Sequence, residues 1–516
     1  MYEVKDRVGT ARSGMLSGDG WQFETPGIDF MDTGRFPAPV NAHPIPDRGE
    51  VRTLNKSIEL YQNPKIFLEE FINFREQIGH QAPLHLPGTA LPHNLALLVY
   101  LGADILDSSR AALLSSEGFF LTSDGALPAD EVGQDECGCR GCGESLYHHN
   151  MLALQTELGR VRGHISRGTL REFVEYRAKT SPRLVEVLRL FDTLHYDFQE
   201  KRCPVKGQNF RAITRLSLHR PDIERFRRRI IQRYRKPPNP QTLVLLPCSA
   251  KKPYSDSSSH YYFRNAIRNS GRAVDVHEVI LTSPLGLVPR ELELFYPAQN
   301  YDIPVTGRWF EDEKHMINNL LKEYLEINNY NNIINHTGMD FLPVEAVSTV
   351  EGSPRSDASL KNLTDALAEL PDTENRWNER SVQEFNSMAL FQFGPDAEGM
   401  FEGANVRGRY PKLRIFRGKE QLASLSYVTG QLVPTLEGSQ FLVEKGIHTV
   451  KIADFEIQGN IFAVGVEDAD SRIRPGDEVA VIRNGELAAC GTATMGGEEM
   501  VQSDRGEAVR VRHRVK

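Results

Sequence analysis

The sequence has few cysteines, no long apolar run and no excess of positive charge, and each of these deficits excludes a class of protein. Six cysteines among 516 residues are too few for a disulfide scaffold. The absence of about 18 consecutive apolar residues argues against a membrane-spanning helix, and Met1–Asp6 leads into a mixed-polarity pattern rather than a signal peptide. We therefore expect a cytoplasmic protein with no membrane partner.

The net charge of -8 argues against a protein that coats nucleic acid indiscriminately, because neutralising phosphates requires an excess of lysine and arginine. Any contact with nucleic acid must then be local. Two basic stretches qualify, one in a probable helix from Arg225 to Lys236 and one at the C-terminus with Arg510, Arg512 and Arg514. A solvated charged face explains either stretch equally well.

The length of the chain predicts several domains, since a single domain holds about 100–200 residues. A hydrophobic content of 40%, a charged content of 25% and a mean hydropathy of -0.41 are ordinary for a globular protein. Short apolar runs alternate with helical segments up to about Arg202, as where Leu95–Leu101 leads into Ala103, Ile105 and Leu106. This alternation predicts βα units.

A second α/β domain begins after Lys236-Pro237-Pro238-Asn239-Pro240, because consecutive prolines end the basic helix. The apolar run Thr242–Leu246 then predicts a buried parallel strand that delivers a polar loop at its C-terminal end. We predict another strand over Asp275–Leu281 and an amphipathic helix over Asp312–Ile327. The asparagine-rich segment 328–335 is interpreted as a turn before the next strand.

Turn signals separate short strands in the last part of the chain and predict a small β-barrel. These signals are Gly459-Asn460, Pro475-Gly476-Asp477 and Asn484-Gly485.

Three closely spaced thiols indicate a metal site. Cys137, Cys139 and Cys142 form a CxCxxC pattern, and the glycines between them let the backbone curl so that the sulfurs converge on one cation. Zinc prefers four such ligands, and the imidazole of His148 or His149 can complete the set, with His164 in reserve. A closed site of this kind leaves no position for water, so we expect a structural Zn²⁺ ion.

The N-terminal region resembles archaeal tRNA-guanine transglycosylases. The resemblance is carried by segments 11–14, 23–27, 85–88, 101–109 and 118–122 and by the cysteine cluster, which look like the opening strands and the C-terminal half of that barrel. The match implies that Cys137, Cys139, Cys142 and His149 are zinc ligands, His149 being chosen because Asn150 follows it. It also aligns Asp107 with the aspartate that attacks the ribose.

This region also departs from a transglycosylase. Only a short stretch between Pro26 and His85, with a loop-like part from Pro37 to Pro46, replaces the longer part of the barrel that carries base-recognition residues. Base exchange requires a bound free base and a covalent intermediate, which Asp107 alone cannot provide. A hydrogen-bonding role at a strand end is the other role open to Asp107.

The most specific motif is the segment Pro247–His260, PCSAKKPYSDSSSH, which follows the predicted strand. A thiol, two amines, a phenol, hydroxyls and an imidazole in one loop at the end of a parallel strand are typical of an α/β active site. The pattern PCxxxKPYxxSxxH resembles the signature of the archaeosine synthase family, and segments 282–289 and 301–309 strengthen the resemblance. The family implies a central α/β domain similar to uracil-DNA glycosylase folds.

The resemblance implies a nitrile substrate, and two routes fit the residues present. In one, the Cys248 thiolate adds to the nitrile carbon, an amine displaces the sulfur, and His260 or Tyr254 relays protons. A neighbouring lysine would lower the pKa of the thiol and favour this route. In the other, the amine adds directly and is positioned by Lys252 or Asp107. Packing is the remaining role open to a cysteine after a buried strand.

The last part of the chain resembles a PUA domain, a small RNA-binding barrel. Segments 465–466, 474–479, 490–491 and 510–513 carry this resemblance, and segments 389–394 and 407–411 look like the linker domain that precedes PUA in tRNA-modifying enzymes. The resemblance implies that Arg510, Arg512 and Arg514 meet RNA phosphates.

Together these patterns predict a multidomain α/β and β protein. Its expected parts are a truncated TIM-barrel-like transglycosylase domain with the zinc site (residues 1–202), a central α/β catalytic domain (203–375), a linker domain (376–441) and a PUA β-barrel (442–516). The archaeosine synthase family implies conversion of the nitrile of 7-cyano-7-deazaguanine (preQ0) in the tRNA D-loop to an amidine. Glutamine, asparagine, ammonia or lysine would be the nitrogen donor. The alternatives are a tRNA-guanine transglycosylase and a non-catalytic tRNA-binding protein that supports a partner enzyme.

Overall fold

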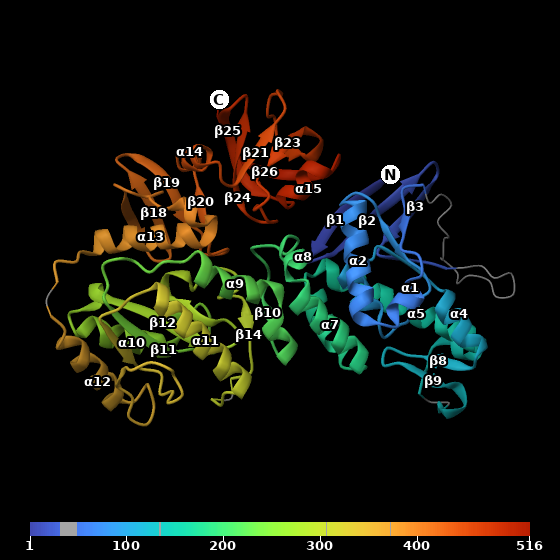
Figure 1. The fold of residues 1–516 in the computed structure, drawn as a ribbon, viewed down its shortest axis with the longest axis horizontal. Coiled ribbons are helices and arrows are strands. Elements are labelled where there is room, and N and C mark those ends of the chain that lie inside the picture. Colours follow the sequence, from blue (N-terminus) through green and yellow to red (C-terminus); the bar gives the residue numbers. More distant parts are fainter. Residues whose placement is uncertain (31–48, 134–135, 306, 372, 516) are drawn as a thin grey trace. The chain divides into compact units, whose positions relative to one another are not determined.

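The computed structural model describes all residues except 31–48, 134–135, 306, 372 and 516, so the predicted loop from Pro37 to Pro46 lies outside the described residues (Figure 1). The described chain forms two compact units. Unit 1 comprises residues 1–204, 462–464 and 498–507, and unit 2 comprises residues 205–461, 465–497 and 508–516. The finer division into four domains stays a prediction.

A four-stranded parallel sheet lies at the centre of unit 1, in the order β4-β7-β6-β5. Its strands are β4 (Gly27–Asp29), β5 (Arg52–Thr53), β6 (Leu84–Leu86) and β7 (Ile105–Asp107). The first of these strands along the chain pairs with the last, which is the pairing that closes a barrel. This arrangement agrees with the expected truncated barrel.

An antiparallel sheet, a hairpin and eight α-helices accompany the parallel sheet in the described part of residues 1–204. The sheet contains β1 (Tyr2–Val8), β2 (Ala11–Gly18) and β3 (Trp21–Thr25), and the hairpin contains β8 (Phe119–Leu121) and β9 (Ala126–Pro128). The helices are α1 (Ser57–Tyr61), α2 (Pro64–Ile78), α3 (Leu95–Leu101), α4 (Ser109–Ser116), α5 (Leu146–Ser166), α6 (Leu170–Ala178), α7 (Pro182–Leu194) and α8 (Tyr196–Glu200).

The predicted order of helix and strand around residue 100 is wrong. Leu95–Leu101 is the helix α3, and Ile105–Asp107 is the strand β7. All seven residues of α3 are buried, and a helix that is apolar all round has the same continuous pattern as a buried strand. Periodicity therefore could not distinguish the two.

A buried carboxylate joins three elements of unit 1. Asp104 accepts hydrogen bonds from Arg12 Nε at 2.7 Å, from Arg75 Nη1 at 3.2 Å and from the backbone N–H of Leu84 at 2.8 Å. Burial alone would raise the pKa of Asp104, but the charges of Arg12 and Arg75 and these hydrogen bonds outweigh it and lower the pKa. Strand β2, helix α2 and strand β6 are thus held by one side chain.

Unit 2 is built around a five-stranded sheet in the order β13-β12-β11-β15-β16, with only β13 antiparallel. The strands are β11 (Thr242–Pro247), β12 (Val276–Thr282), β13 (Gly286–Pro289), β15 (Asn332–Asn335) and β16 (Val347–Ser348). A further parallel pair consists of β10 (Phe210–Arg211) and β14 (Tyr301–Asp302). The strands predicted from Thr242 and Asp275 are confirmed.

The helices of this sheet form two pairs, in which α10 (Ser258–Asn269) packs on α12 (Asp357–Ala368) and α11 (Glu311–Ile327) packs on α9 (Pro221–Gln232). The chain moves from β11 to β12 through α10, and back past β11 to β15 through α11. Because such crossovers are right-handed, α10 and α11 cover opposite faces. The topological switch point therefore lies between β11 and β15, and the loops that follow β11 and β12 leave the same carboxyl edge of the sheet, where such folds bind their ligands.

The basic stretch in α9 is neither a solvated face nor an exposed nucleic-acid surface over most of its length. The side chains of Arg225, Arg227 and Arg229 are buried. Arg227 pairs with Glu224 at 2.8 Å, and Arg228 bonds the same carboxylate at 2.8 Å. Arg225 and Arg229 are four residues apart and share one side of the helix, whereas Arg227 lies on another side, so α9 is packed around most of its circumference, which a count of charges does not reveal.

The remainder of unit 2 is mostly antiparallel. Helix α13 (Trp377–Phe393) packs against the sheet of β17 (Asn405–Arg409), β18 (Lys412–Arg417), β19 (Glu420–Leu425) and β20 (Leu432–Pro434), which is followed by α14 (Leu436–Lys445). A six-stranded sheet comes last, with strands β21 (Thr449–Ile452), β22 (Ile461–Phe462), β23 (Val466–Ala469), β24 (Glu478–Arg483), β25 (Glu486–Ala493) and β26 (Glu507–Arg514). Helix α15 (Gly497–Gln502) follows β25 in the chain, and all of it except Gly497 is assigned to unit 1. Asn484 and Gly485 both adopt positive φ in the hairpin between β24 and β25, as the turn signal predicted.

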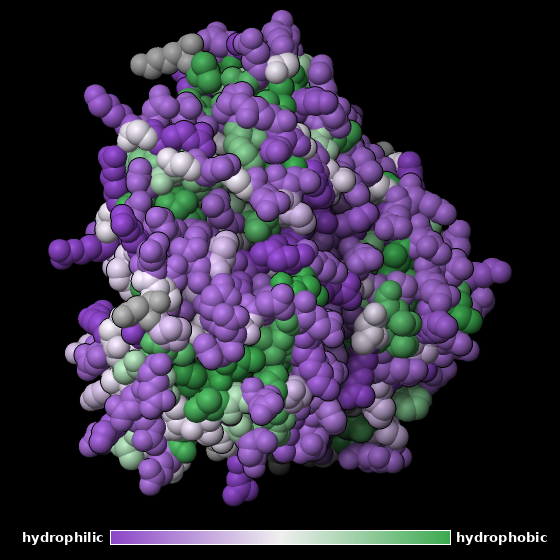
Figure 2. Space-filling view, turned by 60° about the vertical axis from the view of Figure 1, so that its left-hand side comes forward, coloured by the Kyte–Doolittle hydropathy of each residue, from purple (hydrophilic) through white to green (hydrophobic). Residues whose placement is uncertain are grey.

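No helix within the described ranges has the length and apolar character needed to cross a membrane. The face drawn in Figure 2 is mainly hydrophilic, with apolar residues gathered in several patches.

Replacing Asp104 by Asn should destabilise the protein, because Arg12 and Arg75 would remain buried without their carboxylate. Loss of one partner of a buried ion pair costs about 3–5 kcal/mol. The free energy of unfolding, measured with urea, should fall accordingly, whereas the exposed Asp19→Asn control should change it by less than about 0.5 kcal/mol. Since the folded-state pKa is depressed, this contribution is present above the unfolded pKa of about 3.9 and is lost as the pH falls below it. Equal stability of both variants would contradict the structure.

Candidate active site and candidate metal centre

Four side chains of unit 1 converge with metal-ligand geometry. Cys137, Cys139, Cys142 and His149 place one ligand atom each within 4.8 Å of one another. The Nδ1 atom of His149 lies 3.7, 3.3 and 3.2 Å from the sulfurs of Cys137, Cys139 and Cys142, respectively. Three thiols and an imidazole around one point are the donor set of a closed metal site.

The residue pattern left three histidines as candidates for the fourth metal ligand, and in the structure only His149 faces the thiols. His149 donates from Nε2 to the carbonyl oxygen of Leu121 at 2.9 Å, which fixes the tautomer and leaves Nδ1 for a metal. His148 instead lies 2.9 Å from the Ser145 hydroxyl, and His164 lies 2.8 Å from the Thr169 hydroxyl. Asn150 accepts from the backbone N–H of the same Leu121 at 2.8 Å, so strand β8 holds this turn of α5 in place.

In unit 2, the side chain of Tyr301 contacts residues from several segments at the C-terminal edge of the central sheet. Its hydroxyl lies 2.5 Å from the Tyr254 hydroxyl and 2.5 Å from the Thr282 hydroxyl. The ammonium group of Lys252 lies 4.0 Å from the centre of the Tyr301 ring. The loop after β11, the end of β12 and strand β14 thereby meet at one aromatic side chain.

Cys248 and Lys252 perturb each other within this cluster. Burial raises the pKa of Cys248, although a hydrogen bond with Thr282 and the Lys252 charge oppose the rise. Burial also lowers the pKa of Lys252, against the attraction of Cys248 and Asp302. Lys252 lowers the thiol pKa as expected of a neighbouring lysine, but burial has the larger effect, so the pKa of Cys248 is raised overall. Both groups are shifted toward their neutral forms, which suits proton exchange between them.

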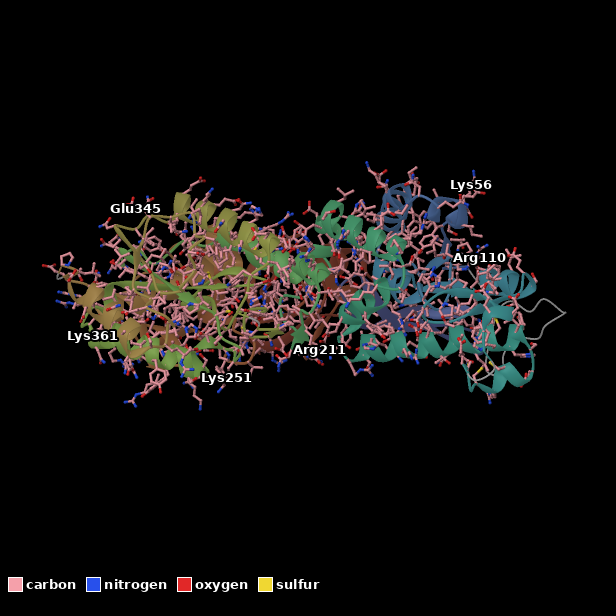
Figure 3. All side chains as sticks on the ribbon, turned by 90° about the horizontal axis from the view of Figure 1, so that it is seen from below. Lys56, Arg110, Arg211, Lys251, Glu345 and Lys361 are labelled. Atoms are coloured by element: carbon pink, nitrogen blue, oxygen red, sulfur yellow. The ribbon has the colours of Figure 1, made fainter. Side chains whose placement is uncertain are left out.

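The two adjacent lysines of the loop differ in environment. Lys251 is exposed and extends from the surface (Figure 3), whereas Lys252 is partly buried over the Tyr301 ring. They provide a matched pair for experiment.

His260, in the first turn of α10, is fully buried. Its Nδ1 atom accepts a hydrogen bond from Arg290 Nη2 at 2.7 Å. Burial, assisted by the Arg290 charge, holds the pKa of His260 well below its usual value. Because Nδ1 accepts, the proton of this neutral imidazole resides on Nε2.

The loop is braced by charged and phenolic partners that the sequence did not single out. Glu293 bonds Arg290 at 3.0 Å, accepts from the Ser255 backbone N–H at 2.9 Å and accepts from Tyr410 at 3.0 Å. Tyr427 donates to Asp256 at 2.8 Å. The two tyrosines come from the antiparallel sheet that follows α13, so this sheet supports the central loop.

A cavity of about 310 Å³ opens beside the cluster at the same edge of the sheet. Ser283 and Pro284 line it directly after Thr282, and Ile303 and Pro304 line it shortly after Tyr301. Both segments belong to the motifs at 282–289 and 301–309. The sequence singled out both motifs, but only the fold shows that they line the same cavity.

Asp107 belongs to unit 1, whereas Cys248, Lys252, Tyr254 and His260 belong to unit 2. Its carboxylate accepts from the backbone N–H groups of Gly88 at 3.1 Å and Ser109 at 3.0 Å and from the Ser109 hydroxyl at 2.5 Å. His85 Nε2 lies 3.5 Å away. Burial would raise the pKa of Asp107, but these hydrogen bonds outweigh it and lower the pKa.

The three C-terminal arginines lie in β26 and have different surroundings. Arg510 is exposed. Arg512 pairs with Glu478 at 2.6 Å and donates to the carbonyl of Pro434 at 3.0 Å. Arg514 donates to the carbonyl of Ile457.

Comparisons with known proteins identify two family models and several relatives that this chain resembles. Residues 223–367 match a family model described as a domain of unknown function (DUF5591), and residues 450–515 match the PUA domain. The archaeosine synthase subunit alpha of Methanosarcina acetivorans is 38% identical over 508 residues, which cover 90% of this chain and 80% of the relative. The archaeosine synthase of Haloferax volcanii is 37% identical over 516 residues, which cover 95% and 86%, respectively. The tRNA-guanine(15) transglycosylase of Methanococcus maripaludis is 27% identical over 489 residues, which cover 86% and 67%.

A PUA domain in a chain whose relatives over most of its length are archaeosine synthases and tRNA-guanine transglycosylases defines a tRNA-modifying enzyme. Identity above 30% over most of both chains is specific enough to name the family. The chain belongs to the archaeosine synthase family.

Proposed function

We propose that this protein converts the nitrile of preQ0, already built into tRNA, to an amidine at the cluster of Cys248, Lys252 and Tyr301. The opposite pKa shifts of Cys248 and Lys252 beside a cavity are the observation that carries this proposal. A nitrile carbon needs a nucleophile, and its nitrogen needs a proton. A thiol and an amine that interact electrostatically at one edge of the sheet can supply both.

The proposed reaction begins with transfer of the Cys248 proton to Lys252 while the sulfur adds to the nitrile carbon. The nitrogen takes the proton from Lys252, which gives a thioimidate bound to Cys248. The amine of the donor then adds to the same carbon, the carbon–sulfur bond breaks, and the leaving thiolate recovers a proton that the donor nitrogen releases. No bond to ribose breaks, and no electrons are exchanged.

In this scheme Tyr254 and His260 are positioning residues. Tyr254 is fully buried and holds the Tyr301 hydroxyl, and His260 is bonded to Arg290. A neutral, fully buried imidazole fits a role in shaping the loop better than a proton relay to the substrate.

The donor is proposed to be glutamine, asparagine, ammonia or lysine, as expected from the family. Relatives named as an alpha subunit support a second subunit that acts together with this chain.

Asp107 is proposed to hold the loop at Gly88 and Ser109 rather than to attack ribose. Its oxygens already accept hydrogen bonds from that loop, and a nucleophilic carboxylate would have to give them up. This geometry argues against the transglycosylase alternative. Labelled guanine exchange into tRNA would restore that alternative, and tight tRNA binding without any product, even with donors and candidate partners supplied, would favour the non-catalytic one.

We propose that the ion at Cys137, Cys139, Cys142 and His149 is structural Zn²⁺. Soft thiolates and one imidazole in a closed set match zinc and leave no position for a reacting water.

The His149→Ala variant should contain far less than one equivalent of zinc, whereas His148→Ala, its neighbour outside the cluster, should retain about one equivalent. A structural ion contributes to folding, and for a domain of about 200 residues a loss of about 3 kcal/mol lowers Tm by roughly 6–12 °C. Metal analysis and calorimetry measure the two effects. Less than about half an equivalent of zinc in the purified wild-type protein would show that the assignment is wrong.

Replacing Lys252 by Ala should lower the rate of preQ0-tRNA conversion by about 10²–10⁴-fold, the usual contribution of a positioned acid or base. The Lys251→Ala variant should retain most of the activity, because Lys251 extends into solvent. Asp107→Asn should cost much less than Lys252→Ala. Mass spectrometry of tRNA nucleosides, with each donor in turn, measures the product.

The conversion rates of these variants are compared only where the variant is folded and its tRNA affinity is unchanged. Conversion at the wild-type rate by both Lys252→Ala and His260→Ala would place the chemistry elsewhere. The Cys248→Ser variant distinguishes the two routes, because only the thioimidate route requires the sulfur.

The Arg510→Ala variant should bind tRNA more weakly, with the slope of log affinity against log salt reduced by about 1 for one lost phosphate contact. Arg512→Ala should reduce stability as well, because Glu478 and Pro434 would lose their partner. The exposed Arg189→Ala in α7 serves as the control. Deletion of residues 446–516 with affinity and salt slope both unchanged would exclude an RNA-binding role for the C-terminal region.

A further inference from the structure

The cavity beside the cluster has walls of distinct chemistry. Ser283 lies at its inner end, Glu313 comes from the first turn of α11, and Phe310 and Ile213 stand at its margin. A volume of about 310 Å³ is at the lower limit of small-ligand sites, which suits one heterocyclic base.

The inner wall holds a polar atom that pairs with none of the described residues. Ser283 is 5% exposed, and its hydroxyl has no hydrogen-bond partner in the part of the chain that the structure describes. A buried hydroxyl left unpaired costs about 1–3 kcal/mol, so such an atom in a cavity wall indicates a ligand that pairs with it. Ser283 directly follows Thr282, which bonds Cys248 and Tyr301.

Glu313 supplies a carboxylate to the same cavity. One of its oxygens accepts from the backbone N–H of Phe310 at 2.9 Å, which fixes the side chain at the start of α11. Its negative charge contributes to the raised pKa of Cys248, so the carboxylate lies within electrostatic range of the thiol. The second oxygen remains available as an acceptor for a ligand.

The margin of the cavity exposes apolar surface. Ile213 and Phe310 are 61% and 60% exposed, respectively. The Arg215 guanidinium lies 5.2 Å from the centre of the Phe310 ring and 3.5 Å from Asp312. An aromatic ring with an arginine on it is a common stacking platform for a nucleobase.

We propose that this cavity receives the substrate base, extruded from the tRNA, and reads its guanine-type edge through Glu313 and Ser283. A 7-cyano-7-deazaguanine base carries the O6 carbonyl, the N1–H and the 2-amino group along its Watson–Crick edge, and the nitrile at C7 on the adjacent Hoogsteen side, next to O6. Glu313 accepts from N1–H and the 2-amino group, Ser283 donates to O6, and Phe310 stacks on the ring. The nitrile is then directed toward Cys248.

This inference rests on the proposed function for the identity of the base. It adds the residues that select a guanine-type ring over any other nitrile-bearing base. Enzymes that modify a base commonly take it out of the stack and read its Watson–Crick edge in a pocket.

The test uses two tRNAs that carry the same nitrile on different rings, 7-cyano-7-deazaguanine and 7-cyano-7-deazaadenine, at the target position. The second ring has an acceptor at N1, an amino group in place of O6 and no 2-amino group. Wild-type protein should convert the first much faster, as judged by kcat/KM. In Glu313→Gln the ratio of the two kcat/KM values should fall by about 10–100-fold, the usual discrimination of a two-point base contact.

Glu311→Gln is the matched control. Glu311 lies two residues away, is exposed and pairs with Lys314 at 2.7 Å, so its replacement should leave the ratio unchanged. Ser283→Ala supplies a second variant and should lower the ratio by a similar factor, which keeps the test decisive if Glu313→Gln does not fold.

The same preference is measured as tRNA affinity in the Cys248→Ala variant, which separates base recognition from the reaction. A preference for the guanine-type tRNA that Glu313→Gln removes would support the inference even if wild-type protein converted neither substrate, a result that would refute only the proposed function. An unchanged ratio in both Glu313→Gln and Ser283→Ala would overturn the inference. A raised KM for the nitrogen donor with no change in the ratio would also overturn it, because the cavity would then hold the donor.

Discussion

The hydroxyl of Tyr301 is the point on which the proposed active site depends. It lies at hydrogen-bond distance from Tyr254 and Thr282, while Lys252 stands over its ring. Three chain segments with different directions are thereby held at one edge of the sheet. Hydrogen bonds among fully buried phenols have no competing water, so the arrangement is rigid. A reaction between a thiol, an amine and a nitrile requires a rigid arrangement of this kind, because the reaction rate falls steeply when the reacting atoms are misplaced.

A second layer of polar groups supports this edge, partly from the antiparallel sheet β17–β20. Glu293 joins Arg290, Ser255 and Tyr410, and Arg290 in turn orients His260. Gly430, between β19 and β20, lies so close to the Leu294 carbonyl that a Cβ there would overlap it. This sheet and its loops therefore pack directly against the segment that carries Glu293.

The amino-acid sequence by itself determined the elements whose signals are local. The continuous apolar run of β11, the helix from Glu311 and the turn at Asn484-Gly485 follow from patterns within a few residues. The CxCxxC spacing likewise predicted a cluster of thiols, and the loop from Pro247 to His260 predicted a reactive site at a strand end. Each of these signals is carried by neighbouring residues, since backbone preferences and apolar periodicity act over short distances.

Tertiary structure decided what depends on residues far apart in the chain. Whether His148 or His149 faces the thiols follows from the Leu121 carbonyl, and the role of Lys252 depends on Tyr301, 49 positions later. Burial outweighs the effect of Lys252 on the pKa of Cys248, and it encloses Arg225, Arg227 and Arg229 of α9 within the fold. The apolar run Leu95–Leu101, expected to be a strand, is the buried helix α3. Desolvation and long-range contacts arise only when the chain is folded, so no local pattern could have supplied them.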